Sequence, residues 1–350
     1  MKINKNIIVR FAAAALGLFM LAGCSDAIQT STVEETAGTD LSDTYAFIAK
    51  DIQNPYMQKV YEGFQTAFSE LGSSSVYKAP EANTPEKQVE IINELVSQGI
   101  AGIAVAANDA DMLEDALKAA MEAGVEVISL DSAVNKESRR THIQQADPEL
   151  IGRSLVRAAY DIVGGNGGIG ILSTTYQATN QNLWISYMEQ EIAENPEKYA
   201  STPIVQIAYG DDDETKSISE TQSLLENPDI KVIIAPTSVG ITAAAQVLRE
   251  TESDVKLTGL GMPSQMAEYI ESGICPKMYL WNPVDVGYLA GYTLKALSDG
   301  TITGAQGEVF TAGTLGERTV TLDDEQGTEI MLGDLLEFDS TNIGEWKGAF

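Results

Sequence analysis

Asp131 directly follows the short apolar run at 125–130, which is rich in β-branched residues. Such a run is typical of a strand that is buried on both faces of a parallel sheet. Asp131 then stands at the carboxyl end of this strand, where open α/β sheets bind ligands, although an Asp in this place can also simply cap a turn. Lys50 follows the apolar run at 44–49 in the same way. A charged acceptor and a charged donor are therefore expected at one edge of a sheet.

Three amides, Asn180, Gln181 and Asn182, stand together at the expected start of a helix. Amides both donate and accept hydrogen bonds, which suits the hydroxyl groups of a sugar. The alternative, in which one Asn caps the helix and the other amides face solvent, stays open. Asn108 follows a further expected strand, and two roles are open for it: capping the next helix or contacting a ligand.

Apolar runs alternate with helical patterns from residue 44 onward. Four βα units end at Asp131, the rhythm breaks at 132–147, and a second set of units begins at Pro148. The segments 103–131 and 232–261 both contain a strand, a polar turn, an Ala-rich helix and a strand, so the two sets look like copies of one unit. This alternation predicts an α/β fold of two doubly wound parallel-sheet lobes, joined by a multi-segment hinge, with a ligand cleft between them.

The predicted first lobe comprises residues 44–144 plus 282–310, and the predicted second lobe comprises residues 145–281 plus 311–350. The chain is expected to cross between the lobes near 132–147, near 280–283 and near Phe310, and these crossings would form the hinge. Asn282 lies at one of them and is expected to add a ligand contact.

Residues 1–23 have the pattern of a signal peptide. A basic start precedes the apolar stretch at 11–21, which is too short to span a bilayer, because a span needs about 20 apolar residues. Cys24 directly follows Leu-Ala-Gly, as in the bacterial lipobox, and is expected to become a lipidated N-terminus; the alternative is an ordinary signal with an incidental Cys. Residues 24–43 are polar and acidic and predict a flexible tether. We therefore expect an exported protein, lipid-anchored at the extracytoplasmic face of the cell membrane.

Several kinds of site are not expected. The net charge of −29 disfavours nucleic acid as a partner, because phosphate backbones need a basic face. His142 is the only histidine and is expected to be structural, so we expect no metal site and no cofactor. Gly165–Gly170 matches G-x-G-x-x-G, but it follows a helix and precedes a strand, the reverse of a dinucleotide site. The acids in Gly210–Glu214 lack the ligand spacing of a Ca²⁺ loop and are favoured at a helix start by the helix dipole.

Taken in order, the motifs AANDAD, ISLDS, TNQNLW, IIAPTSVG and WNPVDVGYLAGY resemble those of one family. It comprises the substrate-binding proteins of ABC importers with the ribose-binding, or type I periplasmic-binding, fold. The resemblance covers about residues 44–350 and is strongest to the branch of rhamnose-binding and autoinducer-2-binding proteins. It implies a small sugar-like ligand in the cleft and the transmembrane subunits of an ABC permease as partners.

In the autoinducer-2 receptors of this branch, the ligand is held by a Lys after the first strand, an Asp after the fourth, an Asp-Gln pair on a second-lobe helix, and a Pro-x-Ala. The matching residues here are Lys50, Asp131, Asn180, Gln181, Pro236 and Ser238. Asn180 replaces the Asp and Ser238 replaces the Ala, whereas the Asn-Gln pair is what the rhamnose-type proteins carry. Rhamnose and autoinducer-2 therefore both remain candidate ligands, and both are small, oxygen-rich and ring-forming. Tyr56 and Trp184 would offer an apolar wall to a sugar face.

Two other classes of function compete with this one. A sugar-active enzyme such as a glycosidase would use Asp131 and another acid, but neither a second acid nor a nucleophile–base pair emerges from the sequence. A sugar-responsive transcription factor shares the two-lobe fold but needs a basic DNA-binding module, and the chain has a signal-peptide pattern instead. We therefore expect a binding protein and not an enzyme.

Overall fold

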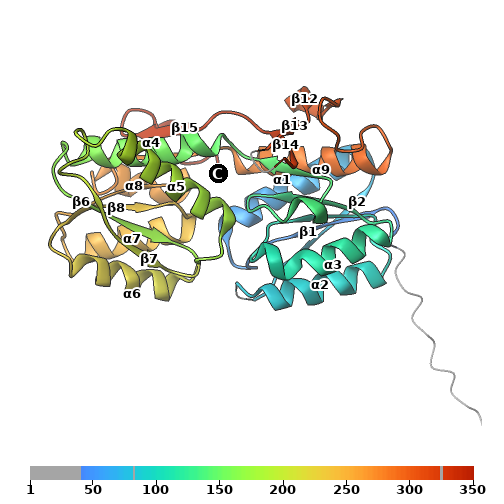
Figure 1. Cartoon of the computed structure of the whole chain (residues 1–350), viewed down its shortest axis with the longest axis horizontal. Helices are drawn as coiled ribbons and strands as arrows, with labels where there is room; N and C mark the ends of the chain where they lie inside the picture. Colours follow the sequence, from blue (N-terminus) through green and yellow to red (C-terminus); the bar gives the residue numbers. More distant parts are fainter. Residues whose placement is uncertain (1–40, 82, 324–325) are drawn as a thin grey trace, which may run out of the picture. The chain divides into compact units, whose positions relative to one another are not determined.

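The computed structural model of the protein describes residues 41–81, 83–323 and 326–350. In this part the chain forms two α/β lobes, each built on a mostly parallel sheet, which confirms the predicted fold class (Figure 1). The predicted signal peptide, Cys24 and all of the predicted tether except 41–43 lie outside the described residues. Among the described helices, none has both the length and the hydropathy that a membrane span requires.

The first lobe is built on a sheet in which the described strands follow the order β13-β14-β5-β4-β3-β1-β2. Their bounds are β1 (Thr44–Ile48), β2 (Ser74–Lys78), β3 (Gly102–Val105), β4 (Glu126–Leu130), β5 (Thr141–Gln144), β13 (Thr321–Leu322) and β14 (Thr328–Met331). One face is covered by α1 (Pro55–Leu71) and α9 (Pro283–Ser298), and the other by α2 (Pro85–Ser97) and α3 (Ala110–Glu122) (Figure 1). The strand order reverses between β1 and β3, and sheets of this kind bind ligands at the carboxyl ends of the strands beside such a switch point.

The second lobe repeats this plan, with the strand order β7-β6-β8-β9. Its strands are β6 (Gly168–Ser173), β7 (Ile204–Tyr209), β8 (Ile230–Ala235), β9 (Lys256–Gly259), β10 (Lys277–Leu280) and β15 (Leu336–Asp339). Its helices are α4 (Pro148–Ile162), α5 (Thr179–Glu194), α6 (Glu214–Leu225), α7 (Ser238–Glu250), α8 (Pro263–Glu271) and α10 (Ile343–Trp346). A parallel bridge between Leu260 and Tyr279 extends the sheet to β10, which pairs with β15. The switch point therefore lies between β6 and β8, in the place of β1 and β3, which confirms that the lobes are two copies of one unit.

Two first-lobe helices begin at polar side chains that cap them. Asn54 caps α1, because its Oδ1 accepts hydrogen bonds from two N–H groups of the first turn at 3.0 and 3.3 Å. Asp109 caps α3 through its Oδ1. The cap of α3 is therefore not Asn108, whose side chain is left for other contacts.

The glycine-rich run at 165–170 ends a helix, as predicted. α4 stops at Ile162, Gly164 and Gly165 have φ angles of 61° and 75°, and β6 begins at Gly168. Left-handed backbone at these positions costs a glycine little, so the run makes a tight turn.

Within the described residues the chain crosses between the lobes at 145–147, 281–282 and 332–335. The first two crossings agree with the prediction, but the third was expected near Phe310, and that expectation is wrong. β14 pairs with β5, with Ile330 opposite Ile143, so β13 and β14 belong to the first-lobe sheet and not to the second lobe. The physical reason is that β5 offers an open strand edge, and nothing in the short strands of the tail tells which edge they join.

Two glycines allow α1 and α9 to touch backbone to backbone. A Cβ atom added at Gly63 would lie 1.8 Å from the carbonyl oxygen of Val284, and one at Gly287 would lie 1.7 Å from that of Val60. No other residue type fits at this separation. The contact therefore joins α9, which begins directly after the crossing at 281–282, to the helix that begins at the cleft.

Two smaller strands, β11 (Val309–Thr311) and β12 (Glu317–Thr319), form an antiparallel pair between α9 and β13 in the sequence. Two short 3₁₀ helices, η1 (Lys136–Ser138) and η2 (Gly313–Leu315), complete the described elements.

Candidate functional site

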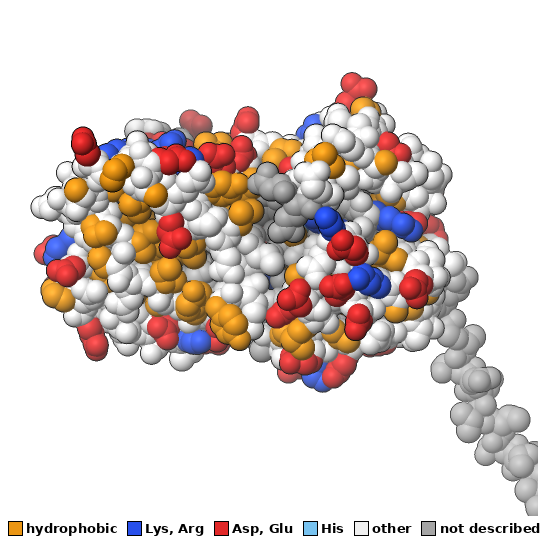
Figure 2. All heavy atoms as spheres, viewed as in Figure 1, with side chains coloured by type: hydrophobic (Ala, Val, Ile, Leu, Met, Phe, Trp, Pro, Cys, Tyr) orange, Lys and Arg blue, Asp and Glu red, His pale blue; other side chains and the backbone are white. Residues whose placement is uncertain are grey.

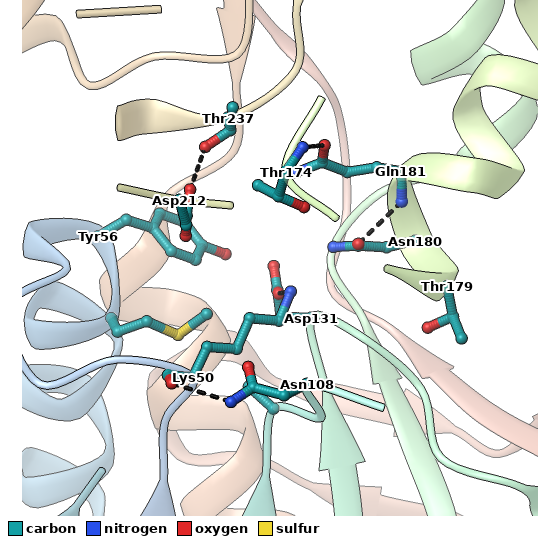
Figure 3. Close-up of polar contacts among 12 residues, drawn as sticks. Lys50, Tyr56, Asn108, Asp131, Thr174, Thr179, Asn180, Gln181, Asp212 and Thr237 are labelled. Carbon is teal, nitrogen blue, oxygen red and sulfur yellow. Dashed lines mark hydrogen bonds and ion pairs between the residues drawn. The ribbon is translucent and has the colours of Figure 1, made fainter. Parts of the chain in front are cut away.

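Lys50 and Asp131 form a buried ion pair at the carboxyl ends of β1 and β4. The Lys50 Nζ lies 2.8 Å from the Asp131 Oδ2 (Figure 3). Asp131 has a φ of 61°, a left-handed conformation that costs most residues about 1 kcal/mol or more but that Asp tolerates comparatively well. Strained backbone of this kind concentrates at ligand sites. The structure thus brings together the two charged residues that the sequence placed at one sheet edge.

Buried amides hold the backbone at Lys50 in place. Asn108 Nδ2 donates to the Lys50 carbonyl at 3.1 Å, and the Asn108 N–H donates to Gln88 Oε1 at 2.9 Å. Gln88, which is fully buried, donates in turn to the carbonyls of Ala49 and Ala106, so it ties the end of β1 to the end of β3. Asn108 Oδ1 is buried and accepts no hydrogen bond from the described residues. Asn108 therefore positions Lys50 and keeps one acceptor beside the cleft.

A cavity of about 40 Å³, here called the cleft cavity, lies between the lobes. Eight of the ten predicted ligand residues line it: Lys50, Tyr56, Asp131, Asn180, Gln181, Trp184, Pro236 and Ser238. A volume of this size holds one or two water molecules and not a sugar. A molecule larger than water therefore fits here only if the space between the lobes widens.

Three aromatic rings form one wall of the cleft cavity. Trp281 stands between Tyr56 and Trp184, at centroid distances of 6.3 and 6.0 Å. The Trp281 indole N–H donates to the Tyr56 hydroxyl at 2.8 Å, which leaves the Tyr56 proton available as a donor. Burial, and then the nearby Asp131 charge, raise the pKa of Tyr56 well above its usual value, so this phenol stays neutral. The predicted apolar wall is present, and Trp281, which the sequence analysis did not single out, is its centre.

Asn180 and Gln181 face the cleft cavity from the start of α5 (Figure 3). Gln181 Oε1 accepts hydrogen bonds from Ser173 Oγ at 2.7 Å and from the Thr174 N–H at 2.9 Å, so its orientation is set by the end of β6. Asn180 Oδ1 accepts from the Gln181 N–H at 2.8 Å. Neither amide caps the helix, because Ala178 occupies the cap position. Both amide NH₂ groups are thereby oriented with no partner in the described part of the chain.

Asp212 also lines the cleft cavity, although it is not among the predicted ligand residues. Its Oδ1 accepts from Thr237 Oγ1 at 2.5 Å (Figure 3). Its Oδ2 accepts from Asn54 Nδ2 at 2.9 Å. The acids of Gly210–Glu214 were assigned to the helix start, and Asp213 does cap α6, but Asp212 does not take part in that cap. Asp131 therefore does have a second acid beside it in the cleft cavity, contrary to the prediction.

Asn282 is not brought to the cleft cavity. Its Oδ1 accepts from the Val284 N–H at 3.0 Å, and its Nδ2 donates to Asp285 at 2.8 Å. It caps α9 directly after a lobe crossing, so its predicted role as a ligand contact is corrected to a structural one. Asn108 also lies outside the cleft cavity, on a neighbouring cavity described next.

Larger cavities adjoin the cleft cavity on two sides. One, of about 900 Å³, shares Asn54, Asp212 and Ser238 with it. The other, of about 450 Å³, shares Asp131, Asn180 and Trp184. The cleft cavity is therefore the narrow middle of a continuous interlobe groove. On the face drawn in Figure 2, the described Lys and Arg side chains are scattered among acids and gather into no basic patch.

The arrangement suits binding of a polyol more than catalysis. Charged and amide groups with defined orientations meet an apolar wall, as ligand pockets generally do. His142 is buried, its Nδ1 lies 2.9 Å from Ser129 Oγ, and burial lowers its pKa well below the usual value. Within the described residues, no group of three potential ligands could hold a metal ion.

Comparisons with known proteins agree with this geometry. Residues 45–302 match the model of the periplasmic binding protein domain. A solved ABC-transporter solute-binding protein from Clostridium phytofermentas, with bound L-rhamnose, is 42% identical, with a TM-score of 0.85 over 88% of this chain and 99% of that one. LsrB from Clostridium saccharobutylicum, in complex with AI-2, is 26% identical, with a TM-score of 0.81 over 87% of this chain and 99% of that one.

Among curated proteins, the ribose import binding protein RbsB of Escherichia coli is 24% identical over 231 residues, which are 64% of this chain and 74% of RbsB. The family and its structural neighbours are solute-binding proteins and not enzymes, which confirms the prediction on that point despite the second carboxylate. The chain belongs to the periplasmic binding protein family, as a sugar-type solute-binding protein of ABC transporters that acts outside the cytoplasm.

Proposed function

We propose that this protein is lipid-anchored through Cys24, binds a small ring-forming sugar of the rhamnose type in the cleft cavity, and delivers it to the permease of an ABC importer. One observation above all supports a sugar as the class of ligand. The amides of Asn180 and Gln181 face the Lys50–Asp131 pair across the cavity, so donors and acceptors surround a small volume from both lobes. The hydroxyl groups of a sugar, which donate and accept in turn, match this shell.

The identity of residue 180 favours rhamnose. An Asn-Gln pair distinguishes rhamnose-type proteins from the autoinducer-2 receptors, which carry Asp-Gln. The relative with bound L-rhamnose is 42% identical to this chain, and the relative in complex with AI-2 is 26% identical. Autoinducer-2 is the second candidate, because Lys50, Asp131, Gln181 and Pro236 match its receptors as well.

Binding and delivery are linked by the two-lobe architecture. A ligand that contacts both lobes binds the closed form better than the open one, and it shifts the equilibrium by that difference in affinity. The closed, loaded form is then the species that a permease can distinguish from the empty one.

The test is calorimetric titration of the purified protein without residues 1–40. The ligands to be titrated are L-rhamnose, other hexoses and pentoses, and AI-2. We expect L-rhamnose to bind most tightly. We expect Asn180→Ala to bind L-rhamnose at least tenfold more weakly, because the variant loses one or two oriented hydrogen bonds to the sugar. Asn182→Ala is the matched control, because Asn182 is exposed and its Nδ2 donates to the Tyr176 carbonyl outside the cleft cavity. Failure of every sugar to bind, or equal losses in the two variants, would contradict the proposal.

A further inference from the structure

We propose that Asp212 is a specificity-determining residue, a second carboxylate that faces the sugar and bonds the opposite lobe, so that the closed cleft accepts neutral sugars and rejects anionic ones. This inference rests on the proposed function and deepens it. None of the family residues carried over to this sequence corresponds to Asp212, and the reasons for assigning it a role come from its backbone, its contacts and its charge.

The backbone around Asp212 is unusual. Asp211 and Asp212 have φ angles of 54° and 57°, two successive left-handed residues that are not glycine. Each such residue costs about 1 kcal/mol or more, and strain of this kind persists where surrounding contacts enforce it. The turn gives the three successive acids different tasks: Asp211 pairs with Lys216, Asp213 caps α6, and Asp212 is directed into the cleft.

The contacts of Asp212 join both lobes. Thr237 stands at the cap position of α7, but its hydroxyl donates to Asp212 and not to the helix. Asn54 uses its Oδ1 to cap α1 and its Nδ2 to donate to Asp212 from the first lobe. Two residues at helix starts thus direct donors to one carboxylate. Each carboxylate oxygen can accept a second hydrogen bond, so Asp212 can also accept one from a ligand hydroxyl.

The charges that line the cleft cavity are those of Lys50, Asp131 and Asp212, and their sum is negative. The Lys50 charge favours the ionised form of Asp212, whereas the Asp131 charge opposes it. Burial is the largest influence and raises the pKa of Asp212 above its usual value. A bound anion would add a further negative charge beside buried side chains, where like charges repel more strongly than they do in bulk water. A neutral polyol meets no such cost and gains charge-assisted hydrogen bonds.

The first experiment uses Asp212→Asn, which keeps the side-chain shape and one acceptor oxygen but removes the charge. We would titrate it with L-rhamnose and with the uronate of the same ring stereochemistry, in which a carboxylate replaces the methyl group. We expect the affinity for rhamnose to fall about tenfold or more, and the preference for rhamnose over the uronate to shrink at least tenfold. Asp211→Asn is the matched control, with the same chemical change and the same backbone conformation one residue away, and it should behave like the wild type.

The second experiment tests the bond across the cleft. Asn54→Asp keeps the cap of α1, because Asp caps as well as Asn does, but places a second carboxylate against Asp212. We expect it to weaken rhamnose binding and to enlarge the radius of gyration of the sugar-free protein. The double variant Asn54→Asp/Asp212→Asn restores the bond with donor and acceptor exchanged, so it should bind rhamnose no more weakly than Asp212→Asn alone, and the two losses should not add.

The outcomes separate this inference from the proposed function. If the wild type binds rhamnose and Asn180→Ala weakens it, but Asp212→Asn binds rhamnose and rejects the uronate as the wild type does, the inference is overturned and the function stands. If the losses of Asn54→Asp and Asp212→Asn add in the double variant, the cross-lobe bond has no part in binding, which contradicts the inference as well. If the wild type binds no sugar at all, the proposed function fails, and the role of Asp212 in selecting a sugar fails with it.

Discussion

The Lys50 ammonium lies 2.8 Å from the Asp131 carboxylate, and each side chain is only 8% exposed. Removing two charges from water costs free energy that their mutual attraction offsets only when further hydrogen bonds are made. Ligand hydroxyls would supply such bonds in the cleft cavity. The pair is therefore better explained as a preformed part of a binding site than as a device for stability.

Asp131→Asn should abolish binding while the protein stays folded. Asn tolerates left-handed backbone as Asp does, so this change removes the charge without adding the strain that Ala would bring at a φ of 61°. Loss of charge-assisted bonds, each worth about 1.5–3 kcal/mol, weakens binding at least tenfold, and calorimetry measures it. Asp109→Asn is the control, since it exchanges one good cap of α3 for another. Near-normal affinity in Asp131→Asn would refute the assignment.

Asn180→Asp should shift the preference from rhamnose toward autoinducer-2. The change recreates the Asp-Gln pair of the autoinducer-2 receptors, and it replaces an amide that donates with a carboxylate that only accepts. We expect the ratio of the two affinities, measured by competition, to change at least tenfold. A ratio that stays constant would mean that residue 180 does not select between these ligands.

Ligand should compact the protein. Lys50 and Asp131 belong to the first lobe and Asn180 and Gln181 to the second, so a ligand that contacts all four favours closure. We expect small-angle scattering to give a smaller radius of gyration at saturation, and hydrogen exchange to slow on both lobes. The backbone change should concentrate at 145–147, 281–282 and 332–335. Protection confined to one lobe, without compaction, would place the ligand outside the interlobe groove.

Glu191 should make stability depend on pH in the acid range. Hydrogen bonds from Arg157, and then from Arg153 and Tyr199, lower the pKa of Glu191 from 4.5 to about 2. Because the folded-state pKa is the lower one, this stabilisation is complete above pH 4.5 and is lost as the pH falls toward 2. Glu191→Gln should cost about 3 kcal/mol at pH 7 and flatten the slope of melting temperature against pH in that window. Glu189→Gln, at an exposed position on the same helix, should change neither quantity.

Cys24→Ser should release the protein from membranes. Acyl chains on Cys24 are the proposed anchor, and no described helix could replace them. Fractionation of cells should move the variant from the membrane pellet to the soluble fraction, while Cys275→Ser, at the buried second cysteine, should leave the protein in the pellet. A Cys24→Ser protein that still pellets would argue for another mode of attachment.

The position of Lys50 and Asp131 could be predicted because strand ends in a doubly wound sheet meet at one edge, whatever the details of packing. The inward orientation of Asp212 could not be predicted in the same way. Three acids at a helix start are explained by the helix dipole alone, and the turn that directs Asp212 inward depends on Asn54 and Thr237, which are distant in the sequence.

Asn282 was misassigned although the sequence held a signal. Asn282-Pro283 repeats Asn54-Pro55, and in both places the Asn side chain caps a helix whose first residue is the Pro. The sequence contains no comparable signal for the pairing of β14. A short strand pairs with whichever sheet edge the rest of the fold leaves open, and that this edge is β5 is known only once the fold is known.

The glycine contact between α1 and α9 joins the crossing at 281–282 directly to the helix that begins at the cleft cavity. α9 begins directly after the crossing at 281–282. Because Gly63 and Gly287 lack a Cβ atom, α9 packs against α1 with no side chain between the two backbones at these positions. A small turn of the backbone at that crossing is therefore expected to move α9 and α1 together, and with them Tyr56, whose hydroxyl accepts from Trp281 at the same crossing. A larger residue at Gly63 or Gly287 would force the two helices apart, so the placement of Tyr56 relative to this crossing depends on the absence of two Cβ atoms.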